Sequence, residues 1–437
     1  MLNIGGYYMK SKTLLHALLI LTLSTTFACS KKDNQTEFSL PDGTQQQVDI
    51  HLADSTFSSG KKLSLSTGIG SGAYRFHADP SGVIYTISDR GPNIKCSDDK
   101  KLIGADICKK GKIFPVPEFA PTIYKYKITK ESAELLEMIT LKDSSGKDIT
   151  GLPNPFLKTN TEQAFDVNGN PIEFDPSGVD TESLIKLSDG TYWLSEEYGP
   201  SIMHVAADGK VIKRLVPAGL EEDLKGAKYP VVGTLPEILM KRKLNRGIES
   251  ISVDPSENNL YFILQSPLAN PDSKAYKKSA YVRIFKMDLA SEKITNEYIY
   301  QMEDPATFIK DNLKKNRKQN DVKISEMVGL AEDKLLVLER ISASTKLFVI
   351  DLSNADSILN TVWDDIKKKE TFEQLTHTDF KPVSKKLVFD TDNEENLPNK
   401  IEGIALMKNG KAVLVNDNDF GIAGDKTTFT TVSIPLQ

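Results

Sequence analysis

Five segments of the chain follow one template: an apolar run, a turn and a second apolar run, with acidic or polar residues at both outer ends. In "ESLIKLSDGTYWLSEEYGP" and "EGIALMKNGKAVLVNDND" the turns SDG and KNG are typical of β-hairpins. The two outer ends of an antiparallel hairpin lie side by side, so the acids that bracket one hairpin emerge together. The template predicts three such pairs: Glu182 with Glu197, Glu326 with Glu339, and Glu402 with Asp417.

The repeat predicts an all-β chain. Weaker strand patterns follow each hairpin, which makes units of four antiparallel strands, and repeating such units around an axis limits exposed edges. The hairpins start at residues 71, 182, 249, 326 and 402, wider than the ~40–50 residues of a typical blade, so long loop insertions are expected. We therefore expect a β-propeller with five recognisable four-stranded blades and room for a sixth. The segment "QQVDIHLA" near the N-terminus could supply the fourth strand of the last unit.

The first 29 residues read as a signal peptide, with two lysines, a short apolar run and small Ala28 directly before Cys29. This ending resembles a bacterial lipobox, which implies lipidation of Cys29; a plain secreted protein is the alternative. Ser30 after the cysteine favours the outer membrane of a bacterial cell envelope. Residues 30–47 are polar and predict a tether, which leaves 48–437 as the folded domain.

The remaining cysteines, Cys96 and Cys108, predict a disulfide in an oxidising compartment, with two unpaired thiols as the alternative. The formal net charge is only −5, without the basic stripe that nucleic-acid binding requires, so no nucleic-acid partner is expected. Membrane contact is expected only through the lipid anchor. The sequence leaves the oligomeric state open.

If the units pack radially, the repeated acids meet at one mouth of a central channel, where their mutual repulsion calls for a cation. Oxygen ligands select a hard cation, Ca²⁺ first and Mg²⁺ second. No histidines stand at zinc-site spacing, and "GIGSGAY" lacks a glycine that a serine-hydrolase elbow needs. The candidate metal ligands are Asp89, Glu182, Glu249, Glu326, Glu402 and Asp417.

Basic residues accompany these acids. Arg90, Arg246 and Arg340 are candidates for binding an anionic substrate, since guanidinium groups fork onto phosphate or carboxylate oxygens. Glu197 and Glu339 are the candidate catalytic residues, each as a general base. The alternative is architectural: buried arginine–carboxylate pairs at repeat ends can tie one unit to the next.

Several of these segments together resemble one protein family. They are "ISDRGPN", "ESLIKLSDGTYWLSEEYGPSI", "NRGIESISV", "LLVLER" and "IEGIAL" with "NDNDFG", and they resemble the bacterial phytase-like family, described as having esterase-like activity of phytase. The resemblance runs from about residue 60 to 435. It implies a secreted or periplasmic propeller-like hydrolase of phosphate or related esters. The resemblance also implies that the functional residues are among Glu182, Glu197, Glu249, Arg246, Glu339, Arg340 and Glu402.

Two functions are consistent with this sequence. The first is a Ca²⁺-assisted hydrolase whose substrate is a small anionic ester, either a phosphoric monoester or a carboxylic ester. The second is a lipid-anchored binding module, in which the same channel mouth binds a ligand or a partner protein without catalysis. Both functions are possible because the propeller fold does not determine function.

Overall fold

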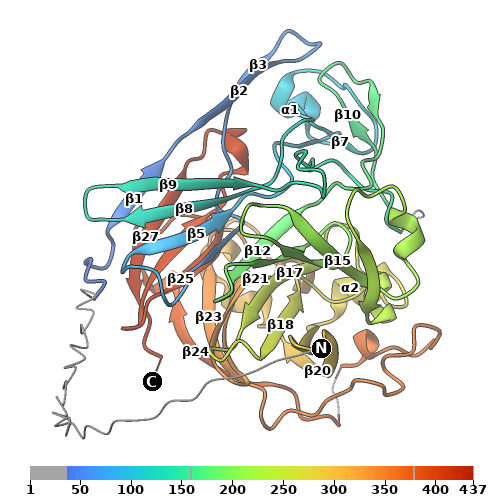
Figure 1. Ribbon diagram of the computed structural model, residues 1–437, viewed down its shortest axis with the longest axis vertical. Coiled ribbons are helices and arrows are strands. Elements are labelled where there is room, and N and C mark those ends of the chain that lie inside the picture. The colour runs from blue at the N-terminus through green and yellow to red at the C-terminus, as the bar shows by residue number, and fades with distance from the viewer. Residues whose placement is uncertain (1–36, 158–159, 377–378, 437) are drawn as a thin grey trace, which may run out of the picture. The chain divides into compact units, whose positions relative to one another are not determined.

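The computed structural model describes residues 37–436 except 158–159 and 377–378, and these residues are mainly β-strands with a few short helices (Figure 1). Glu37–Gln437 form one compact unit. The expected signal peptide and Cys29 lie outside the described residues. The predicted boundary at residue 48 needs correction, because the strand β1 (Gln45–Val48) already belongs to a sheet and residues 37–47 belong to the compact unit.

Five sheets make up most of this unit, and each of the five predicted hairpins forms the first two strands of one of them. The pairing is antiparallel except that β16 runs parallel to β15. The first sheet holds β4 (Gly72–Tyr74), β5 (Val83–Ile87), β8 (Thr122–Ile128) and β9 (Ala133–Thr140). The second holds β12 (Thr181–Lys186), β13 (Tyr192–Glu196), β14 (Ser201–Val205), β15 (Val211–Pro217) and β16 (Val231–Leu235).

The other three sheets have four strands each. The third holds β17 (Ile248–Val253), β18 (Asn259–Leu264), β19 (Tyr281–Asp288) and β20 (Lys293–Gln301). The fourth holds β21 (Lys323–Ala331), β22 (Lys334–Arg340), β23 (Thr345–Asp351) and β24 (Ser384–Asp390). The fifth holds β25 (Ile401–Leu406), β26 (Lys411–Asn416), β27 (Thr427–Ser433) and β1. The N-terminal strand therefore completes the last sheet, as the sequence predicts.

The first two strands of each sheet are the most apolar because neighbouring sheets cover both of their faces. All six residues of β17 are buried, whereas the outer strand β20 alternates between exposed and half-buried residues along its first half. Burial on both faces explains the continuous apolar runs of the hairpins. Gly190 and Gly410 lie at φ 90° and 77° in the hairpin turns, a region that L-residues avoid.

The first strands of the five sheets contact one another in cyclic order. β4 contacts β12, β12 contacts β17, β17 contacts β21, β21 contacts β25, and β25 returns to β4. Glycine permits the closest approaches: a Cβ on Gly72 would lie 2.5 Å from the carbonyl oxygen of Glu182, and one on Gly403 would lie 2.8 Å from the Cβ of Ala73. The five strands thus bring the predicted acids of distant segments to one end of a common bundle.

A smaller cap is built from the segment before β4 and from insertions between β5 and β8 and between β9 and β12 (top of Figure 1). It contains the hairpin β2 (His51–Thr56) and β3 (Lys62–Ser66), the short helix α1 (Asp99–Ile103), and a sheet of β6 (Ile94–Lys95), β7 (Lys112–Ile113), β10 (Ala164–Phe165) and β11 (Pro171–Ile172). The predicted disulfide is present, with Cys96 and Cys108 joined by an S–S bond of 2.03 Å.

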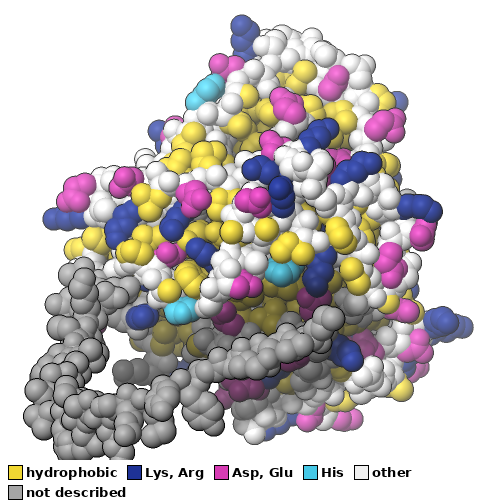
Figure 2. Space-filling model, in the orientation of Figure 1, with side chains coloured by type: hydrophobic (Ala, Val, Ile, Leu, Met, Phe, Trp, Pro, Cys, Tyr) yellow, Lys and Arg dark blue, Asp and Glu magenta, His cyan; other side chains and the backbone are white. Residues whose placement is uncertain are grey.

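Helices are sparse, as expected. Besides α1, they are α2 (Ser273–Lys278), α3 (Ile309–Asn312) and short 3-10 turns such as η7 (Asp419–Gly421). No helix in the described part of the chain is long and apolar enough to cross a membrane. Acidic and basic side chains are interspersed over the face drawn in Figure 2, without a continuous basic stripe on that face.

Candidate active site

A β-bulge aims the predicted acids inward. In four of the five hairpins the first strand carries an extra residue relative to its partner, directly after Thr181, Ile248, Ile324 or Ile401. A bulge bends the strand and redirects a side chain, and bulges are common beside active sites. The residues that follow these four positions are Glu182, Glu249, Ser325 and Glu402.

The bulged ends open into a cavity of about 870 Å³. In each second strand, one residue pairs with the residue that precedes the bulge, and the next residue along that strand lines the cavity. These lining residues are Glu197, Gln265, Arg340 and Asp417. The cavity therefore collects most of the side chains that the sequence singles out. Its lining includes Asp89, Arg90, Glu182, Glu197, Arg246, Glu249, Arg340, Glu402 and Asp417.

Glu326 does not line this cavity, which corrects its assignment as a metal ligand. The position equivalent to Glu249 and Glu402 in β21 is Ser325, so Glu326 stands one residue further along. Its carboxylate accepts hydrogen bonds from the Ala73 amide at 3.0 Å and from two serine hydroxyls, Ser183 at 2.7 Å and Ser250 at 2.6 Å. Burial raises the pKa of Glu326 to about 8. Glu326 therefore ties first strands of different sheets together.

Glu339 also lies outside the cavity lining, so the geometry does not suit it for the role of general base. Its carboxylate is fully buried and accepts hydrogen bonds from the Tyr300 hydroxyl at 2.5 Å, the Glu303 amide at 2.9 Å and the Lys385 ammonium at 2.9 Å. The residue of β22 that does face the cavity is the next one, Arg340. The expected pairing of Glu326 with Glu339 is therefore wrong by one residue in each strand.

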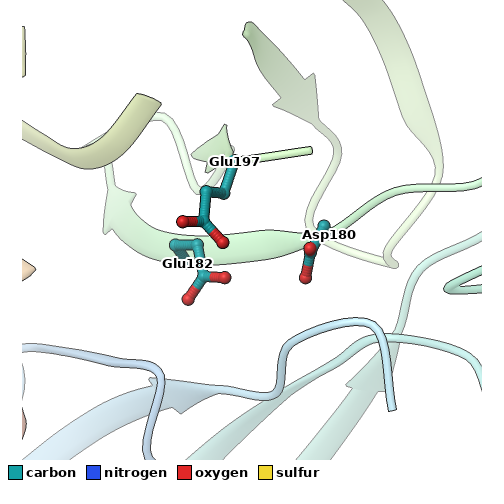
Figure 3. Close-up of side chains that lie close together, drawn as sticks. All are labelled: Asp180, Glu182 and Glu197. Atoms are coloured by element: carbon teal, nitrogen blue, oxygen red, sulfur yellow. The ribbon is translucent and has the colours of Figure 1, made fainter. Parts of the chain in front are cut away.

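The cavity floor brings together carboxylates that are far apart in the chain. Ligand oxygens of Asp180, Glu182 and Glu197 lie within 4.8 Å of one another, and so do those of Glu182, Glu249 and Glu402. Figure 3 shows the first group around one space. The carboxylate of Glu182 makes no hydrogen bond or ion pair with the residues that the structure describes, although Glu182 is only 7% exposed.

The other floor carboxylates are held by neighbouring donors. Asp180 contacts the Nε of Arg90 at 3.2 Å, and Glu249 accepts a hydrogen bond from the Gln265 side chain at 2.6 Å. Glu402 forms an ion pair with Arg340. Partners of this kind fix the orientation of ligand side chains around a metal.

Glu197 is held from two sides. Asn245 donates to one of its oxygens at 2.7 Å, and Arg246 approaches the other at 3.3 Å. Asn245 also accepts a hydrogen bond from Arg90 at 2.5 Å, and its backbone lies in the left-handed region at φ 58°. Non-glycine residues in that region are uncommon and concentrate at functional sites.

Burial and repulsion between carboxylates raise the pKa values of several acids that line the cavity. Burial, followed by the charges of Glu197 and Glu249, raises the pKa of Glu182 well above its ordinary value. Burial together with neighbouring carboxylates likewise raises the pKa values of Glu249, Asp89 and Asp417. A cation in the cavity would relieve this repulsion and favour the ionised carboxylates.

Lysine side chains also line this cavity. Lys323 stands on the wall between arginines and acids, and burial with the charge of Arg246 lowers its pKa to about 8. Burial and the charge of Arg90 likewise lower the pKa of Lys112 to about 8. The cap adds further lysines to the outer wall: Lys95, Lys101, Lys109 and Lys110.

The donor set fits a hard divalent cation. The potential ligands on the floor are oxygens, mainly of carboxylates. Cys96 is tied in the disulfide, and none of the described lining residues is a histidine. Oxygens within 4.8 Å of one another can share one ion, because Ca²⁺–oxygen distances of about 2.3–2.6 Å place opposite ligands up to about 5 Å apart.

Among the cavity residues that sequence reasoning missed, Asp180, Asn245 and Lys323 lie beside the predicted ones. Asp180 had a detectable signal, because it stands two residues before Glu182 at the start of a strand and thus faces the same side. Asn245 directly precedes Arg246 in a loop, and Lys323 is one charged residue among many near it, so no pattern distinguishes either of them.

Comparison with known proteins identifies the family of this chain. The family model for phytase-like proteins, described as esterase-like activity of phytase, matches residues 70–420. The match spans every hairpin that lines the cavity. The chain belongs to the phytase-like family.

Individual relatives are distant. An uncharacterized secreted protein of Arthroderma benhamiae is 25% identical over 203 residues, which are 40% of this chain and 39% of that protein. A luciferin-regenerating enzyme is 10% identical with a TM-score of 0.35, covering 87% of this chain and 95% of its own. The PQQ-bound aldose sugar dehydrogenase of Streptomyces coelicolor is 8% identical with a TM-score of 0.31, covering 91% and 97%. Likenesses at these scores carry no argument about fold or function.

Proposed function

We propose that this protein is a metal-assisted hydrolase of phosphate or related anionic esters. The observation that carries the proposal is the cavity floor, where carboxylates from different sheets meet beside arginines. Glu182, Glu249 and Glu402 would hold a divalent cation, with Ca²⁺ first and Mg²⁺ second. When bound, such an ion neutralises an anionic ester and lowers the pKa of a bound water.

The residues of the chain have distinct roles in this proposal. Arg90, Arg246 and Arg340 orient the anionic group and stabilise the charge that develops on its oxygens. The oxygen of a water molecule bonds to phosphorus while the bond from phosphorus to the alcohol oxygen breaks. A cavity carboxylate accepts a proton from the water, and the carboxylic acid formed in this way gives that proton to the oxygen of the leaving alcohol. Glu197 and Asp417 are the candidates for this carboxylate, since both line the cavity with raised pKa values.

The proposal includes the finer fold and the location of the protein. We infer a β-propeller of five blades, supported by the cyclic contacts of the five first strands and by β1, which completes the last sheet. We place the protein in the bacterial cell envelope, lipid-anchored through Cys29. The lipobox-like segment and the secreted relative support an extracytoplasmic location.

Hydrolysis assays test the function. Purified protein is expected to release p-nitrophenol from p-nitrophenyl phosphate, or to hydrolyse p-nitrophenyl acetate or phytate, with loss of activity on chelation and recovery with Ca²⁺. Glu182→Gln should remove the activity while the protein stays folded. No turnover of any of the three substrates at any Ca²⁺ or Mg²⁺ concentration would refute the enzyme proposal. Ca²⁺-dependent ligand uptake without turnover would favour the binding module instead.

A further inference from the structure

Two groups of carboxylates on the cavity floor share one member. Asp180, Glu182 and Glu197 form the first, and Glu182, Glu249 and Glu402 form the second. Within each group the ligand oxygens are close enough to contact a single ion, so Glu182 stands between two potential ion positions.

The state of Glu182 is an independent indication of a ligand. Its side chain is more than nine-tenths buried, lines the cavity, and has no hydrogen-bond or ion-pair partner among residues 37–436 as described. The carboxylate oxygens of Glu182 are not among the fully shielded unpaired atoms, so they face the open cavity. Partial burial of a charge without a partner is unfavourable, and a cation in the cavity would compensate for it. A carboxylate has two oxygens, and both are available at this position.

The four other carboxylates differ from Glu182 in that each is anchored. Gln265 holds Glu249, and Arg340 holds Glu402. Arg90 holds Asp180, while Asn245 and Arg246 hold Glu197. Anchored ligands on both sides of a central, unanchored carboxylate suit a bridged pair of ions, because neighbouring donors orient the outer ligands and the ions would hold the central one.

We propose that the cavity binds two divalent cations, with Glu182 bridging them. Asp180 and Glu197 complete the ligands of one ion, and Glu249 and Glu402 those of the other. Pairs of ions at ~3.5–4 Å serve phosphoryl-transfer enzymes by stabilising both the attacking and the leaving oxygen. The inference rests on the proposed function, and it makes Glu197 a ligand, so that Asp417 is the remaining candidate for proton acceptor.

Ion stoichiometry tests the inference without any assay of activity. Metal-free protein is titrated with Mn²⁺ and with Ca²⁺ in equilibrium dialysis, and the Mn²⁺ protein is examined by electron paramagnetic resonance. Two ions per chain with a spin-coupled Mn²⁺ pair are expected. Asp180→Asn and Glu249→Gln should each bind one ion and lose the coupling, and Glu182→Gln should weaken both sites at least tenfold. Asp98→Asn, at the exposed rim of the cavity, is the matched control and should keep two coupled ions.

The outcomes separate this inference from the proposed function. One ion per wild-type chain, or two without spin coupling, overturns the bridged pair while a one-ion hydrolase stands. No bound ion at millimolar concentration overturns both. If either ligand variant fails to fold by circular dichroism, the wild-type stoichiometry and coupling still decide the question.

Discussion

Two buried glutamates from different sheets should respond in opposite ways to removal of the carboxylate. Glu326 accepts hydrogen bonds from Ala73, Ser183 and Ser250, whereas Glu182 has no partner in the described chain. Glu326→Ala should therefore destabilise the fold, while Glu182→Ala should leave the stability of the metal-free protein unchanged or increase it. Functional residues are commonly placed at some expense of stability.

The size of the first effect follows from the contacts. Leaving a buried donor without an acceptor costs about 1–3 kcal/mol, and Glu326 serves three donors from outside its own strand. The hydroxyls of Ser183 and Ser250 lie 3.4 Å apart and can partly satisfy each other, so the total is about 4 kcal/mol. An unfolding entropy of ~2.1 cal/mol/K per residue over roughly 400 residues gives about 0.8 kcal/mol/K, hence a fall in Tm of about 5 °C.

Differential scanning calorimetry of both variants in chelator measures this contrast, and calorimetric titration with Ca²⁺ measures ion binding. Glu326→Ala should melt about 5 °C lower than the wild type and keep its ion affinity, whereas Glu182→Ala should melt at or above the wild-type temperature and lose ion affinity. Equal losses of Tm in the two variants, or wild-type Ca²⁺ affinity in Glu182→Ala, would refute the assignment of one acid to the fold and the other to the site.

Other perturbations have defined outcomes. Burial raises the pKa of Glu182 well above its ordinary value of 4.5, so between these two values the metal-free folded protein keeps a proton that the unfolded chain loses. The free energy of unfolding, measured with urea, should therefore be lower at pH 8 than at pH 5. Equal free energies at the two pH values would contradict this. Arg340→Met leaves Glu402 buried and unpaired, which should cost about 3 kcal/mol in metal-free protein and be partly recovered with Ca²⁺. Replacing Cys96 and Cys108 by serine should cost about 3 kcal/mol and raise KM more than it lowers kcat, since the bridged loop lines the cavity; an unchanged KM would argue against a role of the cap in binding.

The hairpins were predictable because their signal is local. Long apolar runs mark all five hairpins, and turn glycines mark three of them, at Gly82, Gly190 and Gly410. The acids at the ends of the second and fifth hairpins lie together, as antiparallel pairing requires. The exact register was less accessible. Aligning the fourth repeat on Glu326 ignored the isoleucine that precedes the bulge in three first strands, Ile248, Ile324 and Ile401.

That isoleucine would have selected Ser325 in place of Glu326, and the corresponding step in the second strand would have selected Arg340 in place of Glu339. Side chains alternate between the two faces of a strand, so an error of one residue assigns to the cavity an acid that in fact packs between the sheets. The cap contribution, by contrast, was not accessible, because its lysines reach the cavity through folding of insertions that share no pattern with the repeat.

The central claim is that acids from separate repeats jointly hold divalent ions on the cavity floor. Crystals soaked in Mn²⁺ and measured at the manganese absorption edge test it directly, because anomalous scattering locates the metal independently of activity. The account predicts strong anomalous peaks beside the carboxylate of Glu182, within ligand distance of the floor acids. A map with no peak in the cavity, or with Mn²⁺ only at surface carboxylates, would contradict it.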